Sequence, residues 1–171
     1  MNTQQTVKMQ LGLWQSAAGS MLEECDDGVL HKTLPDATVT SIASIYAHAI
    51  FSEDAITQGM LQSKPPIYNT DGWKAKTGVA MPENPGMNPE WAATVKMNLP
   101  AFREYAKAVH AATNAYLDNV TESELQEKVQ TPIGDQTKEW VVANLLGTHL
   151  PQHTGEIAAL KGVHGMKGLP F

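Results

Sequence analysis

Apolar residues recur along most of this chain at every third or fourth position, which is the spacing of one buried face of an amphipathic helix. Four segments carry the pattern, at about residues 5–26, 38–62, 88–120 and 137–163. The spacing is helical and differs from the strict alternation that is typical of half-buried strands. The pattern therefore predicts an all-α fold with four long helices.

Residues that favour helix N-termini stand at three of the predicted starts. The second helix is expected to begin near Asp36 or Thr38, whose side chains can accept a hydrogen bond from the first free amides. Asn88 followed by Pro89 marks the start of the third helix, because proline fits the first helical position. Thr137 offers an N-cap for the fourth helix.

Two stretches interrupt the helical pattern. Pro100 lies inside the third segment and is expected to kink that helix or to divide it near Met97, because proline lacks an amide hydrogen. Residues 125–140 are polar and contain the turn signal PIGD at 132–135. We expect a short hairpin or an irregular connection before the fourth helix.

Residues 63–87, between the second and third helices, form a long segment rich in proline and glycine. Such a segment exceeds an ordinary connection in a compact domain. It is interpreted either as a loop packed for structure or as a lid, in which Tyr68, Trp73 and Lys74 would stack on and pair with a small anionic substrate. Nothing in the segment specifies a ligand.

Length, charge and cysteine content narrow the class of protein. The 171 residues suit one domain, residues 1–171, with a core that needs no disulfide. The net charge of −6 comes from dispersed residues, which argues against a nucleic-acid partner. The chain shows neither a secretory leader nor a long apolar span, so a cytoplasmic protein without membrane contact is expected. Cys25 is the only cysteine, so any metal ligands must be imidazoles or carboxylates.

The strongest chemical signal is a pair of histidines in the fourth helix, His149 and His153. Residues four apart share one helix face, so the two imidazoles can converge on one ion. They can also be core histidines, and Pro151 between them can bend the helix. Leu150 occupies the place of the glutamate in the protease signature H-E-x-x-H, and no Glu-x-x-His motif of di-iron bundles occurs. A mononuclear site with a third ligand remains.

Three other histidines are candidates for that ligand: His31, His48 and His110. His48 is the best of them because it lies mid-helix, level with core positions of the second helix. Three imidazoles would leave coordination positions open to water or substrate, which is typical of catalytic zinc sites.

The order of these motifs resembles the DinB-like family, which includes thiol-dependent S-transferases and mycothiol-dependent maleylpyruvate isomerases. The resemblance rests on YAHAIFSED at residues 46–54, TPIGDQT at 131–137, HLPQHTGEIAALKG at 149–162 and GLPF at 168–171. It implies a four-helix bundle of up-down-down-up topology, commonly dimeric. It also implies His48, His149 and His153 as ligands of a divalent metal ion, zinc or nickel first, with iron or manganese as further options.

Acidic residues near these motifs are candidates for orienting the ligands. Glu156 falls where family members carry Gln or Glu, and Glu53 follows His48 as acidic residues do in the family pattern. Either glutamate would accept a hydrogen bond from a ligand imidazole or would be an ordinary polar position. Asp54 is expected to face solvent.

The resemblance implies a metal-dependent transferase that activates a low-molecular-weight thiol for attack on a small electrophile. Arg103 is the only arginine, however, so the chain has no arginine cluster for a carboxylate-rich thiol. Two alternatives stay open at this point. One is a metal-dependent hydrolase of a small substrate, and the other is a dimeric bundle that binds metal or small molecules without catalysis.

Overall fold

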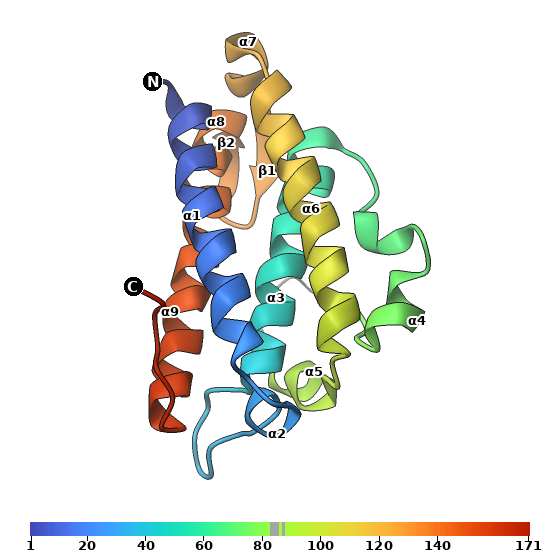
Figure 1. Ribbon diagram of the computed structural model, residues 1–171. Coiled ribbons are helices and arrows are strands. Elements are labelled where there is room, and N and C mark those ends of the chain that lie inside the picture. Colours follow the sequence, from blue (N-terminus) through green and yellow to red (C-terminus); the bar gives the residue numbers. More distant parts are fainter. Residues whose placement is uncertain (83–85, 87) are drawn as a thin grey trace.

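Four long helices pack into a bundle in the computed structural model, which describes residues 1–82, 86 and 88–171. In Figure 1, α1 and α9 descend while α3 and α6 rise, which gives the up-down-down-up arrangement. Helices α1 and α3 each pack against both α6 and α9. The expected all-α bundle is thus confirmed. The four helices are α1 (Thr3–Glu23), α3 (Ile42–Asp54), α6 (Leu99–Asn119) and α9 (Gly147–Val163).

Short elements connect these helices, and in the described part of the chain no helix is both long and apolar enough to cross a membrane. The helical connectors are α2 (Asp27–Leu30), the π-helix η1 (Ala55–Met60), the 3₁₀-helix η2 (Ile67–Asn69), α4 (Trp73–Thr77), α5 (Pro89–Thr94), α7 (Glu122–Leu125), α8 (Lys138–Val141) and the π-helix η3 (Val142–Leu146).

The residues between α7 and α8 form a β-hairpin, the first of the two structures expected there. Strands β1 (Lys128–Thr131) and β2 (Gly134–Thr137) pair antiparallel, with Thr131 opposite Gly134 across a two-residue turn. Gly134 has a φ of 102°, which only glycine adopts readily, so the turn depends on this residue.

Two of the three predicted helix starts are confirmed. The Asn88 side chain accepts hydrogen bonds from the first amides of α5, and the Thr137 side chain accepts one from Trp140 of α8. Pro100 divides the third segment, because α5 ends before it and α6 begins with Asn98 as its N-cap. Local cap chemistry therefore located these ends.

The start of α3 differs from the expectation at Asp36 or Thr38. The N-cap is Ser41, whose side chain accepts a hydrogen bond from the Ser44 amide. Asp36 instead has a φ of 58°, in the left-handed region, and lies in a turn. Residues 32–41 thus form a loop that joins α2 to the start of α3, and these two helices contact each other.

The segment between α3 and α6 runs back along the bundle, because these two neighbouring helices point in the same direction (Figure 1). Asp54, at the end of α3, holds this crossover in place. Its carboxylate accepts hydrogen bonds from the backbone amides of Ile67 and Tyr68, each at 3.0 Å, and from the Tyr105 hydroxyl at 2.7 Å. Asp54 is 0% exposed, so the expectation that it faces solvent was wrong.

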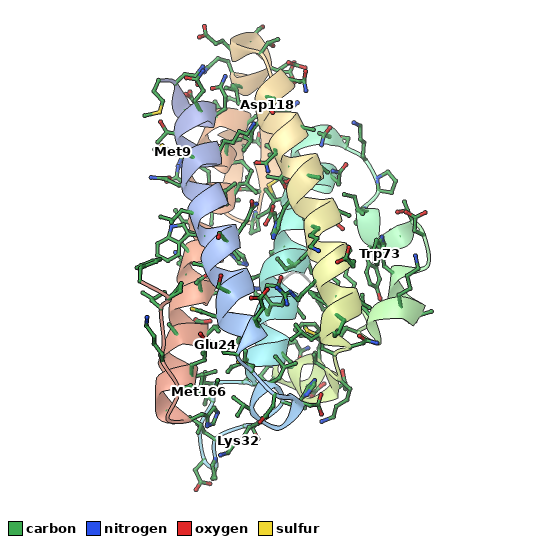
Figure 2. All side chains as sticks on the ribbon, viewed as in Figure 1. Met9, Glu24, Lys32, Trp73, Asp118 and Met166 are labelled. Atoms are coloured by element: carbon green, nitrogen blue, oxygen red, sulfur yellow. The ribbon has the colours of Figure 1, made fainter. Side chains whose placement is uncertain are left out.

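The aromatic residues of the crossover are packed into the bundle. Tyr68 contacts Phe51 and Tyr105, and its hydroxyl donates to the Val79 carbonyl at 2.7 Å. Trp73 also packs on Tyr105, on the side of α6 away from α9 (Figures 1 and 2). The described part of the crossover therefore matches the loop packed for structure, while residues 83–85 and 87 of the predicted segment lie outside the described residues.

Gly78, at the C-terminal end of α4, supports a prediction about this packing. It has a φ of 74°, and an added Cβ would lie 3.0 Å from the Lys96 carbonyl oxygen. Gly72 has a similar φ of 68° but open space around it. We expect Gly72→Ala to lower the free energy of unfolding by about 1 kcal/mol through backbone strain alone. Gly78→Ala should cost about 1 kcal/mol more, because the backbone must also move.

Urea denaturation of the two variants beside the parent measures both effects. Equal losses would show that the contact between Gly78 and Lys96 is not tight in solution.

Candidate metal centre

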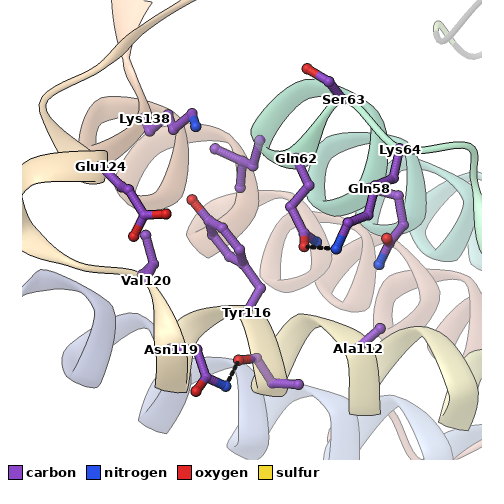
Figure 3. A pocket seen from close by; sticks show the side chains of 12 residues that line it. Gln58, Gln62, Ser63, Lys64, Ala112, Tyr116, Asn119, Val120, Glu124 and Lys138 are labelled. Atoms are coloured by element: carbon purple, nitrogen blue, oxygen red, sulfur yellow. Dashed lines mark hydrogen bonds between the residues drawn. The ribbon is translucent and has the colours of Figure 1, made fainter.

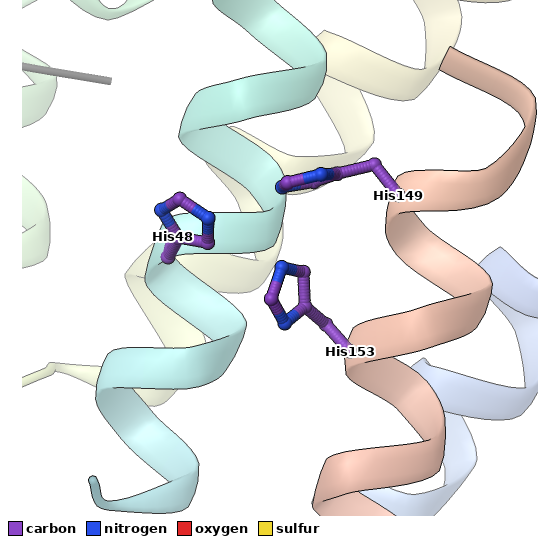
Figure 4. A group of neighbouring side chains, drawn as sticks. All are labelled: His48, His149 and His153. Carbon is purple, nitrogen blue, oxygen red and sulfur yellow. The ribbon is translucent and has the colours of Figure 1, made fainter. Parts of the chain in front are cut away.

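Helices α3 and α9 bring three histidines together in the interior of the bundle. His48 projects from α3 toward His149 and His153 of α9, as Figure 4 shows. The ring centroids are 5.0 Å apart for His48 and His149, 4.9 Å for His48 and His153, and 4.5 Å for His149 and His153. One nitrogen from each ring lies within 4.8 Å of the other two. These are the three histidines that the sequence indicated as ligands.

Pro151 does not separate the two histidines of α9. The helix continues from Gly147 to Val163 with the proline inside it. The π-helix η3 comes directly before α9, and such widened turns occur often at functional sites. Because the helix is continuous, residues four apart still share one face, and both imidazoles point to the same side.

Burial keeps two of these imidazoles in the neutral form. The pKa of His48 is lowered to about 4, first by burial and then by the nearby His153, while Glu156 acts in the opposite direction. Burial, followed by His153 and His48, lowers the pKa of His149 to about 3. At neutral pH both rings therefore carry a free lone pair, which is the state that binds metals.

The Nε2 atom of His149 is buried and has no hydrogen-bond partner among the described residues. Nε2 of His164 shares this feature, but only His149 belongs to the cluster of three histidines. Leaving a buried polar atom unpaired costs about 1–3 kcal/mol, so native proteins rarely do so without a reason. A metal ion bound to this nitrogen would remove that cost.

The three residues fit a divalent transition-metal ion. Imidazole nitrogen suits zinc, nickel, copper and iron. In a tetrahedral site with zinc–nitrogen bonds of about 2.0–2.1 Å, two donors of one ion lie about 3.4 Å apart. The ligand nitrogens here lie within 4.8 Å of one another, so the three rings must move closer together to share one ion. Three protein ligands leave a position for water or substrate.

Glu156 orients one of the three rings. The Nδ1 atom of His153 lies 2.7 Å from Glu156 Oε2. A carboxylate can only accept, so Nδ1 carries a proton, and in the neutral ring the lone pair is on Nε2. This is the contact expected of Glu156.

Glu53 does not accept a hydrogen bond from any of the three clustered histidines, which was one of the roles suggested for it by the sequence. Its buried carboxylate lies 3.0 and 3.1 Å from Nδ1 of His110 and accepts a hydrogen bond from Gln15 at 3.1 Å. It therefore joins α3 to α1 and α6 and orients none of the three clustered histidines. Of the two roles left open for Glu53, orienting a clustered histidine is therefore not the one it has, because five residues after His48 the helix has turned to another neighbour.

The other candidate ligands have structural partners. His110 is paired with Glu53, and His31 accepts a hydrogen bond from the Met97 amide at 2.9 Å. Each therefore serves to connect separate segments of the fold.

A surface depression of about 260 Å³ adjoins the cluster at His153. The loop before α3 forms part of its wall, with Thr38, Val39 and Thr40, and Ile45 and Glu156 complete it. The crossover residues Tyr68, Trp73 and Lys74 are not among the lining residues, so the structure does not place the expected lid there. Ile45 lies one helical turn before His48, and this spacing would have indicated it as a lining residue. No feature of the sequence indicated that Thr38–Thr40 would line the depression.

Comparison with known proteins identifies relatives by family and by fold. The model of the DinB superfamily matches residues 14–157, which include all three histidines. A crystal structure of a conserved protein from Enterococcus faecalis superposes with a TM-score of 0.81 at 20% sequence identity. The alignment covers 96% of this chain and 99% of that one, and this likeness shows the fold. None of the curated proteins matches the chain.

Proposed function

This chain belongs to the DinB superfamily, and from that premise we propose that it is a divalent-metal-dependent, thiol-dependent S-transferase acting on small electrophiles. His48, His149 and His153 would hold the ion, with zinc or nickel as the first choices. The observation that carries the proposal is the buried Nε2 of His149, which has no hydrogen-bond partner among the described residues and belongs to a cluster of three neighbouring imidazoles.

A bound divalent ion would supply Lewis acidity, which lowers the pKa of a thiol so that its thiolate exists at neutral pH. In the transfer, the thiolate sulfur forms a bond to the electrophilic carbon. The bond from that carbon to the leaving group breaks, and the leaving group takes the electron pair. The thiol proton passes to solvent.

The residues of the chain would position the ligands and limit the substrate. Glu156 fixes the ring of His153 through the hydrogen bond at Nδ1. The depression of about 260 Å³ beside His153 admits only small molecules. Its lining contains no lysine or arginine, and Arg103 is paired with Glu23 elsewhere on the surface. The site therefore favours a thiol with few carboxylates.

Hydrolysis of a small substrate is the second candidate. The observation that favours it is the half-exposed carboxylate of Glu156 in the wall of the depression, where it can accept a proton from an attacking water molecule. This reaction would use the same three histidines but no thiol.

An assay of metal-reconstituted protein against a panel of thiols and electrophiles tests the proposal. We expect turnover that requires both the metal and a thiol, with small uncharged thiols preferred over carboxylate-rich ones. A rate that is independent of thiol would assign hydrolysis instead. Stoichiometric metal without turnover of any substrate would leave a non-catalytic binding protein.

Glu156 allows a prediction about the metal site itself. We expect Glu156→Ala to weaken metal affinity by about 10–100-fold, because partners that orient ligand imidazoles have effects of this size. Glu156→Gln should lose less, since its amide oxygen still accepts the hydrogen bond from His153. Glu104→Gln, a change of an exposed carboxylate on α6, is the matched control.

Competition of the apoprotein with a chromophoric chelator gives the metal affinities of these variants. Equal affinity in the parent and in Glu156→Ala would show that Glu156 is an ordinary surface residue.

A further inference from the structure

A second concavity of about 640 Å³ lies between the end of η1, α6, and the α7 and α8 region (Figure 3). None of the three clustered histidines lines it. Its volume is within the range of small-molecule sites. The proposed function does not use this pocket.

Tyr116 of α6 stands in the middle of the pocket, as Figure 3 shows. Its hydroxyl is buried and has no hydrogen-bond partner in the described part of the chain. Burial, and then the charges of Glu124 and Glu127, raise the pKa of Tyr116 to about 12, so the hydroxyl stays protonated and can donate. Leu61 and Ala112 add apolar surface beside the ring. The floor thus combines an apolar platform with one unpaired polar atom.

Two lysines line the pocket, and Lys64 is the one without a carboxylate partner among the described residues. Its ammonium group donates to the side-chain oxygen of Gln62 at 2.8 Å, and no carboxylate of the described residues forms an ion pair with it. Lys138, by contrast, is paired with Glu127 at 2.8 Å, and the Glu124 carboxylate accepts hydrogen bonds from Thr121. One cation is therefore available to a ligand.

The backbone at the rim is held in an unusual conformation. Ser63 has a φ of 54°, in the left-handed region that residues other than glycine rarely adopt. The π-helix η1 directly precedes this turn, and the Lys64 amide bonds back to the Gln58 carbonyl at 2.8 Å. Backbone strain and π-turns both concentrate at ligand sites. Here they place Ser63 and Lys64 at the pocket.

We propose that this pocket binds a small organic carboxylate that has an apolar body and a hydroxyl group at its other end. The carboxylate pairs with Lys64, the body lies on Tyr116 and Leu61, and the hydroxyl bonds to the Tyr116 hydroxyl. Figure 3 shows Lys64 and the Tyr116 hydroxyl on opposite sides of the pocket, which requires two separated polar groups in the ligand. A phosphate dianion fits less well, because it would find one unpaired cation.

Three related probes separate the two contacts: 4-hydroxyphenylacetate, its amide, and phenylacetate. Two-dimensional amide NMR of the full chain locates each probe and gives its dissociation constant. We expect the hydroxy acid to bind about threefold to fivefold more tightly than its amide, the size of a partly exposed ion pair. It should also bind about fivefold more tightly than phenylacetate, which lacks the hydroxyl group.

Two variants assign these preferences to residues. Lys64→Gln should remove the preference for the acid over the amide, and Tyr116→Phe should remove the preference for the hydroxyl. Lys107→Gln, at an exposed position of α6, should change neither. Each variant must retain the parent's amide spectrum outside the pocket.

The proposal would be overturned by equal dissociation constants for all three probes or by shifts confined to residues outside the pocket. Tighter binding of inorganic phosphate than of the hydroxy acid at the same residues would also overturn it. Preferences that persist unchanged in Lys64→Gln and Tyr116→Phe would assign the site to other residues.

Discussion

Replacing His149 with leucine is expected to abolish metal binding and, at the same time, to make the metal-free protein more stable. Leucine is close to histidine in size and fills the same space. It also removes the buried Nε2 that has no hydrogen-bond partner. The imidazole is needed to bind metal but lowers the stability of the metal-free protein. The substitution should therefore lower metal affinity and raise the free energy of unfolding.

The expected magnitudes follow from the two roles of the imidazole. Loss of a residue that only orients a ligand weakens metal binding by about 10–100-fold, so loss of a ligand should cost at least about 100-fold. Removing an unpaired buried polar atom should add about 1 kcal/mol to the free energy of unfolding without metal.

Elemental analysis of protein purified without a histidine tag measures the first effect, and urea denaturation in chelator measures the second. The parent should carry nearly one ion per chain, whereas His149→Leu and a His48→Ala, His149→Ala double variant should carry little. Added metal should raise the stability of the parent but of neither of these two variants.

His110→Leu is the matched control, because His110 is also a partly buried histidine of the bundle. It pairs with Glu53, whose carboxylate would be left buried without its main partner. We therefore expect unchanged metal content and lower stability, the reverse of His149→Leu. Negligible metal in the parent even after reconstitution, with lower stability in His149→Leu, would make these histidines core residues.

The second large effect is expected at Asp54, where alanine should lower the free energy of unfolding by about 3–5 kcal/mol. The carboxylate accepts three hydrogen bonds in a fully buried place, from the amides of Ile67 and Tyr68 and from the Tyr105 hydroxyl. Alanine would leave all three donors without a partner and would release the crossover from α3.

Asp54→Asn is the control of similar size. It keeps one oxygen as acceptor but turns an amide group toward the remaining donors, so its loss should be smaller than that of alanine yet clear. Urea denaturation of both variants gives the free energies. A loss below about 1 kcal/mol for Asp54→Ala would show that water replaces the carboxylate and that the crossover is not fixed by it.

Predictions that rest on local interactions were mostly confirmed, although the N-cap of α3 is Ser41 and not Asp36 or Thr38. Helix periodicity places His149 and His153 on one face regardless of what packs there, and it does so in spite of Pro151. Cap residues such as Asn88 and Thr137 act on amides two or three positions away, so their positions could be read directly.

Expectations failed where they depended on which neighbour a side chain meets. Glu53 and Asp54 adjoin one another in the sequence, yet the first meets His110 and the second meets Tyr68 and Tyr105. Periodicity gives the direction of a side chain from its helix but not the partner that lies there. Likewise, no local feature of the sequence indicated that the loop before α3 would line the opening at His153.

By itself, then, the sequence determined the four helices, most of their ends, and the pairing of His149 with His153 on one side of α9. Only the tertiary structure decided that His48 faces this pair, that Glu156 and not Glu53 contacts the ring of His153, and that Lys64 and Tyr116 share a pocket. The physical reason is range: hydrogen bonds and side-chain spacing within a helix are fixed by nearby residues. Contacts between helices depend instead on the packing of the whole bundle.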